Sequence, residues 1–289
     1  MKKTFKSPAK VNLFLNVIGE RKDGYHYIES LMSKISLFDL VSISVSKGDH
    51  LKIACPGNEK ISNENNLSYK AARAIIDRAA VKAAVDIVIE KMIPIGGGLG
   101  GGSSNAAATL KGLNELLGLS LPKTELANMG SALGADVPFF IYDGAALVEG
   151  IGEKVTPLNN FPELNLVVLN PGYEISTASI YKMIKGGLTR SVLHDIKTSS
   201  FSGIEVILQS INNDLEEFAF KLKPGLSKLK EMLLESGARR ALMSGSGSSF
   251  FGIFDSKEQA CLALETLNRR CSELDAVNKH NVFGVTTEN

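Results

Sequence analysis

A run of glycines at residues 96–102 constrains this chain more than any other segment. Every residue in the run except Leu99 is glycine. Glycine lets a backbone take up positive φ angles and approach a ligand closely, but ordering it costs more conformational entropy than ordering any other residue. An apolar stretch at 85–89 precedes the run and an alanine-rich stretch at 105–117 follows it. Because a flexible linker seldom joins two such segments, we predict an ordered loop between a strand and a helix.

The loop opens directly into the predicted helix, which begins near Ser103 and Ser104. The N-terminus of a helix offers unpaired N–H donors and a partial positive charge. Glycines in front of it let these donors surround an anion without a basic cluster. The sequence therefore predicts a phosphate-binding loop.

Neither common nucleotide motif describes this loop. Gly96, Gly98 and Gly101 satisfy G-x-G-x-x-G, but that fingerprint also requires a βαβ unit with an acidic residue about 20 positions further on. Here the next segment, 123–133, is predicted to be a second helix. The P-loop motif ends in G-K-[ST], whereas this run ends Gly102-Ser103-Ser104 without a lysine.

Composition limits where the phosphate-binding charge can come from. The 32 Lys and Arg residues nearly balance the 31 Asp and Glu residues, so the net charge of +1 provides no footprint for nucleic acid or an anionic membrane. Three cysteines form no disulfide framework, and no apolar run approaches about 18 residues. We expect a cytoplasmic protein with neither a nucleic-acid nor a membrane partner.

The mixture of strands and helices predicts an α+β fold, because the two do not alternate steadily. Asn159 to Pro162 interrupts the pattern, and we place a domain boundary there, giving domains 1–160 and 161–289. The predicted strands are 4–18, 35–45, 51–55, 85–89, 145–148, 164–169 and 281–286, with a strand pair or loop at 240–254. Besides the helices already named, we predict helices at 67–83, near 176–185, at 203–220, 225–236 and 256–271.

Lys10 and Asp136 are the best candidates for phosphoryl-transfer chemistry. Lys10 shares one face of an apolar strand with Asn12, and Asp136 lies among small and apolar residues. A carboxylate in such surroundings is costly unless it is paired, and a paired carboxylate stays ionised and can accept the proton of a hydroxyl. The alternative is that Asp136 caps a helix and Lys10 extends to the surface, and the residue pattern leaves both open.

Two weaker signals accompany these residues. A second glycine- and serine-rich stretch spans 243–252; it can close over phosphates, although a strand-connecting loop packed closely against the first domain is slightly favoured. Tyr25 and His26 follow a turn at Asp23-Gly24. An aromatic ring beside an imidazole can stack on a base and form hydrogen bonds with it, although a surface turn is the simpler interpretation.

Taken together, the motifs resemble those of the GHMP kinases, which include galactokinase, homoserine kinase, mevalonate kinase and phosphomevalonate kinase. The resemblance covers residues 7 to about 252. The three motifs are Pro8–Leu13, Ile95–Ser104 and Met243–Gly247, and the supporting segments are Arg21–His26, Gly134–Phe139, Gly150–Glu153 and Asn213–Glu216.

This resemblance implies a two-domain α+β fold, with an N-terminal domain like ribosomal protein S5 domain 2, a C-terminal ferredoxin-like α/β plait and an active site between them. It implies ATP and Mg²⁺ as cofactors and a monomer or weak homodimer. Within the family, the chain resembles members that phosphorylate the 2-hydroxyl of a cytidine diphosphate sugar-alcohol, a small-molecule partner.

By the matching positions, Asp136 is the expected base and Lys10 its charge partner. Asn12, Tyr25 and His26 are expected to contact the cytidine-bearing substrate, and Tyr181 to lie opposite Tyr25 across the cytosine. The metal ligands stay unassigned, although Ser104 is the usual type of candidate, and residues 186–202 match nothing that assigns them a role. The residues expected to hold the ATP phosphates are Pro94, Ile95, Gly96, Gly97, Gly98, Leu99, Gly100, Gly101, Gly102, Ser103 and Ser104.

Three alternatives differ in class. A homoserine or mevalonate kinase would have no use for the base-binding pair Tyr25 and His26. A non-catalytic nucleotide-binding module could dispense with Lys10 and Asp136, which are both present. A nicotinamide-dependent oxidoreductase would require the βαβ unit that the segment after the loop does not provide.

Overall fold

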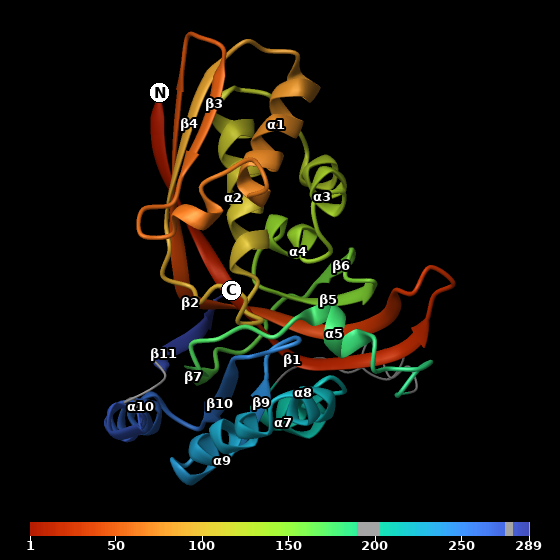
Figure 1. Ribbon diagram of the computed structural model, residues 1–289, viewed down its shortest axis with the longest axis vertical. Helices are drawn as coiled ribbons and strands as arrows, with labels where there is room; N and C mark the ends of the chain where they lie inside the picture. The colour runs from red at the N-terminus through yellow and green to blue at the C-terminus, as the bar shows by residue number, and fades with distance from the viewer. Residues whose placement is uncertain (190–202, 275–279, 289) are drawn as a thin grey trace. The chain divides into compact units, whose positions relative to one another are not determined.

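A computed structural model describes residues 1–189, 203–274 and 280–288 (Figure 1). It divides into two compact units that interleave along the sequence. Unit 1 consists of Met1–Ala9, Leu37–Ile93 and Gly100–Asp143, and unit 2 of Lys10–Ser36, Pro94–Leu99 and Gly144–Asn289. Two long strands, β1 (Lys2–Glu20) and β2 (His26–Ser46), contribute residues to both units. A linear boundary at residue 160 stays a prediction.

In unit 1, four α-helices and one 3₁₀ helix accompany a short sheet. Strand β3 (His50–Ala54) runs parallel to β4 (Ala84–Glu90), and β4 pairs antiparallel with the second half of β2. Helices α1 (Leu67–Ala79) and α2 (Gly101–Leu116) pack side by side (Figure 1). Both helices bury alanines, which allow close approach of their backbones. The remaining elements of unit 1 are η1 (Glu59–Ile61), α3 (Lys123–Ser131) and α4 (Val137–Ile141).

Unit 2 is built on an antiparallel sheet in the order β11-β7-β10-β9. The end of β11 pairs with β2, which also pairs with β5, while β5 pairs with β6 and β1 with β8. The strands are β5 (Ala145–Gly150), β6 (Lys154–Pro157), β7 (Asn165–Asn170), β8 (Asn212–Asn213), β9 (Arg240–Met243), β10 (Phe250–Phe254) and β11 (Asn281–Glu288). The helices are α5 (Thr177–Tyr181), α7 (Ile204–Ser210), α8 (Glu216–Leu222), η2 (Pro224–Leu226), α9 (Ser227–Glu235) and α10 (Lys257–Leu274).

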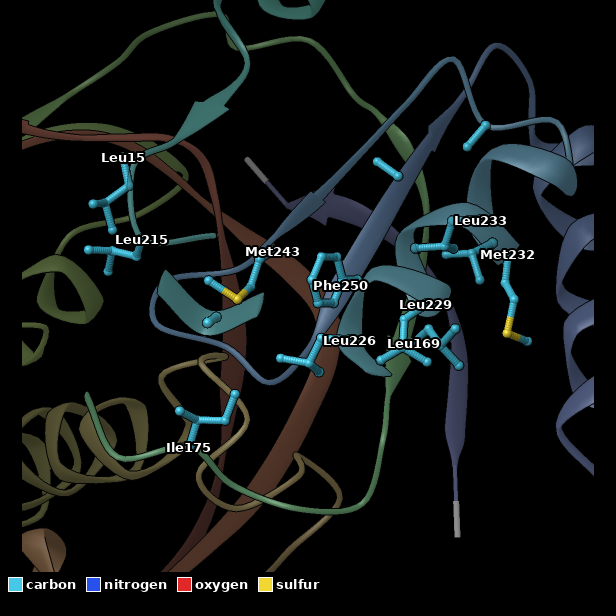
Figure 2. Close-up of a cluster of buried hydrophobic side chains, with 14 of the residues drawn as sticks. Leu15, Leu169, Ile175, Leu215, Leu226, Leu229, Met232, Leu233, Met243 and Phe250 are labelled. Atoms are coloured by element: carbon cyan, nitrogen blue, oxygen red, sulfur yellow. The ribbon is translucent and has the colours of Figure 1, made fainter. Parts of the chain in front are cut away.

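The hydrophobic core of unit 2 holds the hairpin of β9 and β10 in place. Met243 and Phe250 are directly paired across the hairpin and point into one buried cluster (Figure 2). Leu229 and Leu233 of α9 enter the same cluster, and Phe220 of α8 stacks on Phe250 with ring centroids 6.0 Å apart. Because the residues on both sides of the 244–249 loop are buried in this core, the positions of the two ends of the loop are fixed.

Most predicted elements are present, and the α+β class is confirmed. The single helix predicted at 203–220 is wrong, because α7 and α8 are separated by β8. The side chain of Asn213 in β8 donates to the carbonyls of Met243, at the end of β9, and Gly245, in the β9–β10 connection. Tertiary contacts therefore override local helix propensity there. The helix predicted near 176–185 is only the short α5, and the sequence missed α4 and β6. Across the residues that the structure describes, no helix is long and apolar enough to cross a membrane.

Candidate active site

Lys10 is buried in β1, with only 3% of its surface exposed, so it does not extend to the solvent. Its ammonium donates to Asn12 Oδ1 at 2.5 Å and to the carbonyl of Gly98 at 2.8 Å. Asn12, which is fully buried, donates in turn to Ser30 Oγ, and Ser30 donates to the Phe14 carbonyl. The polar face of β1 is therefore a connected hydrogen-bond network that aims a positive charge at the glycine loop.

Positive φ angles shape the first half of the glycine loop. Gly96 and Gly98 have φ of 66° and 76°, which side chains with a Cβ rarely adopt. The carbonyl of Leu99 accepts a hydrogen bond of 2.9 Å from the backbone N–H of Lys10. A Cβ at Gly98 would lie 2.1 Å from the carbonyl oxygen of Ser244. Glycine is required at this position for both backbone conformation and space.

The second glycine-rich stretch packs against the first. It connects β9 with β10, as a strand-connecting loop would, and it also contacts the predicted phosphate loop. Ser244 Oγ donates to the Gly98 carbonyl at 3.0 Å, and the N–H of Ser249 donates to the Gly97 carbonyl at 3.0 Å. A Cβ at Gly245 would lie 3.0 Å from Lys10 Nζ. These contacts bring Ser244 and Gly245 into the candidate site, where the residue pattern alone had slightly favoured a purely structural role.

Asn213 holds the start of the 244–249 loop in place, and the sequence pattern did not single it out. Its side-chain amide donates to the carbonyls of Met243 and Gly245, at 2.8 Å each, while its oxygen accepts from the N–H of Leu215. It thereby fixes the entry of the 244–249 loop. The only signal in the sequence was the position of Asn213 in one of the supporting segments of the family resemblance.

The second half of the glycine loop belongs to unit 1 and begins α2. Gly100 is the N-cap with φ of 70°, and its carbonyl accepts the first helical hydrogen bond from the N–H of Ser104 at 2.9 Å. The N–H groups of Gly101, Gly102 and Ser103 precede that bond and have no earlier carbonyl within the helix. The unpaired N–H donors therefore lie at the positive end of the helix dipole, as a phosphate-binding site requires.

Asp136 is half-buried and immediately precedes α4. Its side chain makes no capping hydrogen bond to that helix, so capping does not explain its presence. A turn holds the preceding residues, with the N–H of Val137 donating to the Gly134 carbonyl at 3.1 Å. Because Asp136 belongs to unit 1 and Lys10 to unit 2, their pairing stays a prediction.

Lys111 of α2 anchors the other end of α4. Its ammonium donates to the Phe140 carbonyl at 3.0 Å, and burial lowers the pKa of Lys111 from its usual 10.5. At pH values between the lowered pKa and 10.5, Lys111 is protonated in the unfolded chain but largely neutral in the folded protein. The free energy of unfolding therefore increases as the pH rises through that window.

We expect the stability of the wild type relative to Lys111→Met to increase from pH 7 towards pH 10. Urea unfolding of both proteins at several pH values measures the difference, and a difference independent of pH would contradict the burial argument.

The predicted substrate residues Tyr25, His26 and Tyr181 all belong to unit 2. His26 is buried, and its ring lies against that of Tyr181 with centroids 5.3 Å apart and planes at 32°. Within the described ranges, neither ring nitrogen of His26 has a hydrogen-bond partner. A buried polar group without a partner is costly, and a bound water or a ligand would supply the missing hydrogen bonds. Tyr25 is 61% exposed, and its placement opposite Tyr181 stays a prediction.

Comparison with known proteins explains why these features occur together. Two family models, described as GHMP kinases N terminal domain and GHMP kinases C terminal, match residues 66–144 and 193–273. The chain belongs to the GHMP kinase family. Members of this family use ATP, and the two-domain GHMP kinase fold expected from the sequence is confirmed.

Individual relatives narrow the family further. A 4-diphosphocytidyl-2-C-methyl-D-erythritol kinase of Syntrophotalea carbinolica is 43% identical over 268 residues, which is 92% of this chain and 95% of the relative. One from Syntrophus aciditrophicus is 41% identical over 88% of this chain and 90% of its own length. A crystal structure of 4-(cytidine 5'-diphospho)-2C-methyl-D-erythritol kinase matches with a TM-score of 0.80 and 32% identity, over 99% of this chain and 100% of the other. Homoserine kinase of Cytophaga hutchinsonii, at 19% identity and a TM-score of 0.76 over 100% of this chain and 95% of the other, shares the fold.

Proposed function

We propose that this protein transfers the γ-phosphoryl group of ATP to the 2-hydroxyl of 4-diphosphocytidyl-2-C-methyl-D-erythritol, a step in the non-mevalonate route to isoprenoid precursors. Full-length relatives with that activity in their names support the assignment. The geometric observation that carries it is His26, a buried imidazole beside an aromatic ring, whose two nitrogens have no hydrogen-bond partner among the residues that the structure describes. A cytosine offers both a stacking face and hydrogen-bonding edges, whereas mevalonate and homoserine contain no base.

In the proposed mechanism, one set of residues binds the ATP phosphates and another activates the accepting hydroxyl. Residues Pro94 to Ser104, with the first turn of α2, bind the ATP phosphates through backbone N–H groups. The hydroxyl oxygen of the substrate forms a bond to the γ-phosphorus as the bond from that phosphorus to the β,γ-bridging oxygen breaks, and ADP leaves. Asp136 accepts the hydroxyl proton. Lys10, its expected charge partner, supplies positive charge that offsets the charge developing on phosphate.

Mg²⁺ is part of this proposal as a partner of ATP. In the described ranges no three or more His, Cys, Asp or Glu side chains group into a metal site. Mg²⁺ bound with a nucleotide usually keeps water and phosphate oxygens as most of its ligands. Ser104, in the first turn of α2, would supply a protein oxygen; its hydroxyl accepts from Ser7 Oγ at 2.8 Å. When bound, Mg²⁺ neutralises charge on the β- and γ-phosphates.

Phosphorus NMR of the reaction mixture tests the proposed activity. With ATP, Mg²⁺ and 4-diphosphocytidyl-2-C-methyl-D-erythritol, we expect ADP and one new phosphomonoester signal in equal amounts, with the new phosphate on carbon 2. Inorganic phosphate in place of the phosphomonoester would show an ATPase. Tight ATP binding without any turnover would favour a non-catalytic nucleotide-binding module.

Tyr25→Ala is expected to weaken binding of the cytidylyl substrate without weakening binding of ATP. Stacking of an aromatic ring on a base contributes about 1–3 kcal/mol, so the KM for this substrate rises by about 5- to 150-fold while the KM for ATP stays nearly unchanged. Steady-state kinetics with each substrate varied in turn gives both constants. Tyr27→Ala is the matched control. Tyr27 is an exposed tyrosine two residues further along the chain, and it is not a predicted substrate residue. Equal increases in both KM values would rule out the stacking role.

A further inference from the structure

A buried polar cluster lies at the base of the glycine loop, in unit 1. It consists of Asp39, Lys91, Asn105, Ser7 and Ser104, and we call it the Asp39 cluster. Asp39 on β2 is fully buried, and the Lys91 side chain is only 6% exposed. Asp39 and Lys91 form an ion pair, and Lys91 Nζ also donates to Asn105 Oδ1 at 3.1 Å. None of the roles assigned above uses Asp39 or Lys91.

Asp39 holds the strand side of the loop. One carboxylate oxygen accepts hydrogen bonds from the backbone N–H groups of Met92, at 2.7 Å, and Ile93, at 2.9 Å. These two residues come between the end of β4 and the first residue of the loop, Pro94. Buried N–H groups require such partners, so the carboxylate determines where the chain leaves β4.

The other oxygen of Asp39 holds the helix side of the loop. It accepts from Asn105 Nδ2 at 2.9 Å. The same nitrogen donates to Ser7 Oγ, which donates to Ser104 Oγ, both at 2.8 Å. Asn105 and Ser104 belong to the first turns of α2. A single carboxylate therefore connects the residues on both sides of the predicted phosphate loop.

Close packing of the two loop ends supports the same conclusion. A Cβ at Gly101 would lie 3.0 Å from a methyl carbon of Ile93 and 3.2 Å from Lys91 Nζ. The last residue before the loop and the first residue of α2 thus touch, with the ammonium of Lys91 beside them. Only a short span is left for the intervening glycines, and its length depends on the Asp39 cluster.

We propose that Asp39 is a positioning residue for ATP: its buried carboxylate, paired with Lys91, sets the separation between the end of β4 and the start of α2 and thereby the conformation in which the glycine loop receives phosphates. The inference rests on the proposed ATP-binding role of the loop. Asp39 itself does not touch the nucleotide. Its effect on the reaction is through the loop, so it acts on ATP affinity rather than on binding of the second substrate.

Asp39→Asn tests this role with little change in volume. The amide oxygen can still accept from Met92 and Ile93, but the amide nitrogen then faces the donors Lys91 Nζ and Asn105 Nδ2. Because buried donors lose their acceptor, we expect the Kd for ATP to increase about tenfold or more. The KM for the cytidylyl substrate should stay within about twofold. Calorimetric titration with ATP, thermal unfolding and steady-state kinetics provide the three readouts.

A second substitution separates positioning from a general loss of folding. In the double variant D39N/N105D, the amide of residue 39 can donate to the new carboxylate and Lys91 pairs with that carboxylate. Ser7 can donate to it as well, with its bond to Ser104 reversed so that the Ser104 hydroxyl donates to Ser7 Oγ. We expect the double variant to recover most of the ATP affinity that D39N loses. Asp86→Asn is the matched control, because Asp86 is hydrogen-bonded to His50 on the exposed side of β4.

The outcomes distinguish the two proposals. If the wild type fails to bind ATP, the proposed function fails and this inference fails with it. If the wild type binds ATP but folded D39N binds it with the same affinity, only the positioning role is overturned. A parallel loss of affinity for ATP and for the cytidylyl substrate, not recovered in D39N/N105D, would mean that Asp39 only stabilises the fold, which also overturns the inference.

Discussion

Asp136→Asn should lower kcat by about 10²- to 10⁴-fold, the usual contribution of a positioned general base. The carboxamide keeps the shape of the side chain but cannot accept the hydroxyl proton. Asp136 makes no capping bond to α4, so the substitution removes no helix cap. Affinity for ATP should therefore be nearly unchanged, and a titration with ATP together with a turnover assay measures both quantities.

Asp143→Asn is the control for this prediction. Asp143 lies at the other end of the same short helix region, 70% exposed, in an ion pair with Lys123. Removing an exposed ion pair costs at most about 1 kcal/mol, so this variant should retain wild-type turnover. Wild-type kcat in Asp136→Asn would exclude Asp136 as the base. A loss of ATP affinity equal to the loss of kcat would instead assign Asp136 to nucleotide binding.

Gly98→Ala is expected to damage ATP binding more than any other single methyl group in the loop. The new Cβ would lie 2.1 Å from the Ser244 carbonyl oxygen and 2.8 Å from that of Gly247, and the φ of 76° is unfavourable for alanine. Both neighbours are backbone atoms that cannot move independently. Backbone strain of this kind costs about 1–3 kcal/mol before the clash is counted. We expect kcat/KM for ATP to fall at least about 100-fold.

Gly118→Ala separates conformational strain from the clash. Gly118 also has a positive φ, of 65°, but no described atom lies within 4 Å of the position its Cβ would take. This variant should lose some thermal stability and keep its kcat/KM for ATP. If Gly98→Ala kept wild-type kinetics, the contact between the glycine loop and the 244–249 loop would have no functional importance.

Local signals made much of the fold predictable. The alanine-rich stretch after the glycines forms α2, and the apolar run at 85–89 forms β4, because hydrophobic pattern and length agree in both. The break between α7 and α8 was not predictable, since Asn213 is drawn out of a helix by carbonyl groups that are distant in the sequence. Helix α4 has only five residues, too short for a helical period to be recognised.

Some residues of the candidate site were also predictable from local sequence, and others were not. Glycine at 96 and 98 was predictable as a functional feature because positive φ angles require it. Lys10 was recognisable as a charged residue in an apolar strand, and Asp39 gives the same signal in Phe38-Asp39-Leu40. The role of Asp39 could not be inferred from the sequence, because its partners just after β4 and on α2 lie more than fifty positions further along the chain. Contacts of that range depend on the folded topology.

Relative kcat/KM values for three acceptors test the central claim most directly. ATP consumption is measured with the wild-type protein and with 4-diphosphocytidyl-2-C-methyl-D-erythritol, mevalonate or homoserine at matched concentrations. We expect turnover with the cytidylyl substrate and a specificity at least about 100-fold lower for the two acceptors without a base, since both stacking and the hydrogen bonds to His26 are then lost. Comparable or greater kcat/KM with mevalonate or homoserine would contradict the assignment of Tyr25, His26 and Tyr181 to a cytosine.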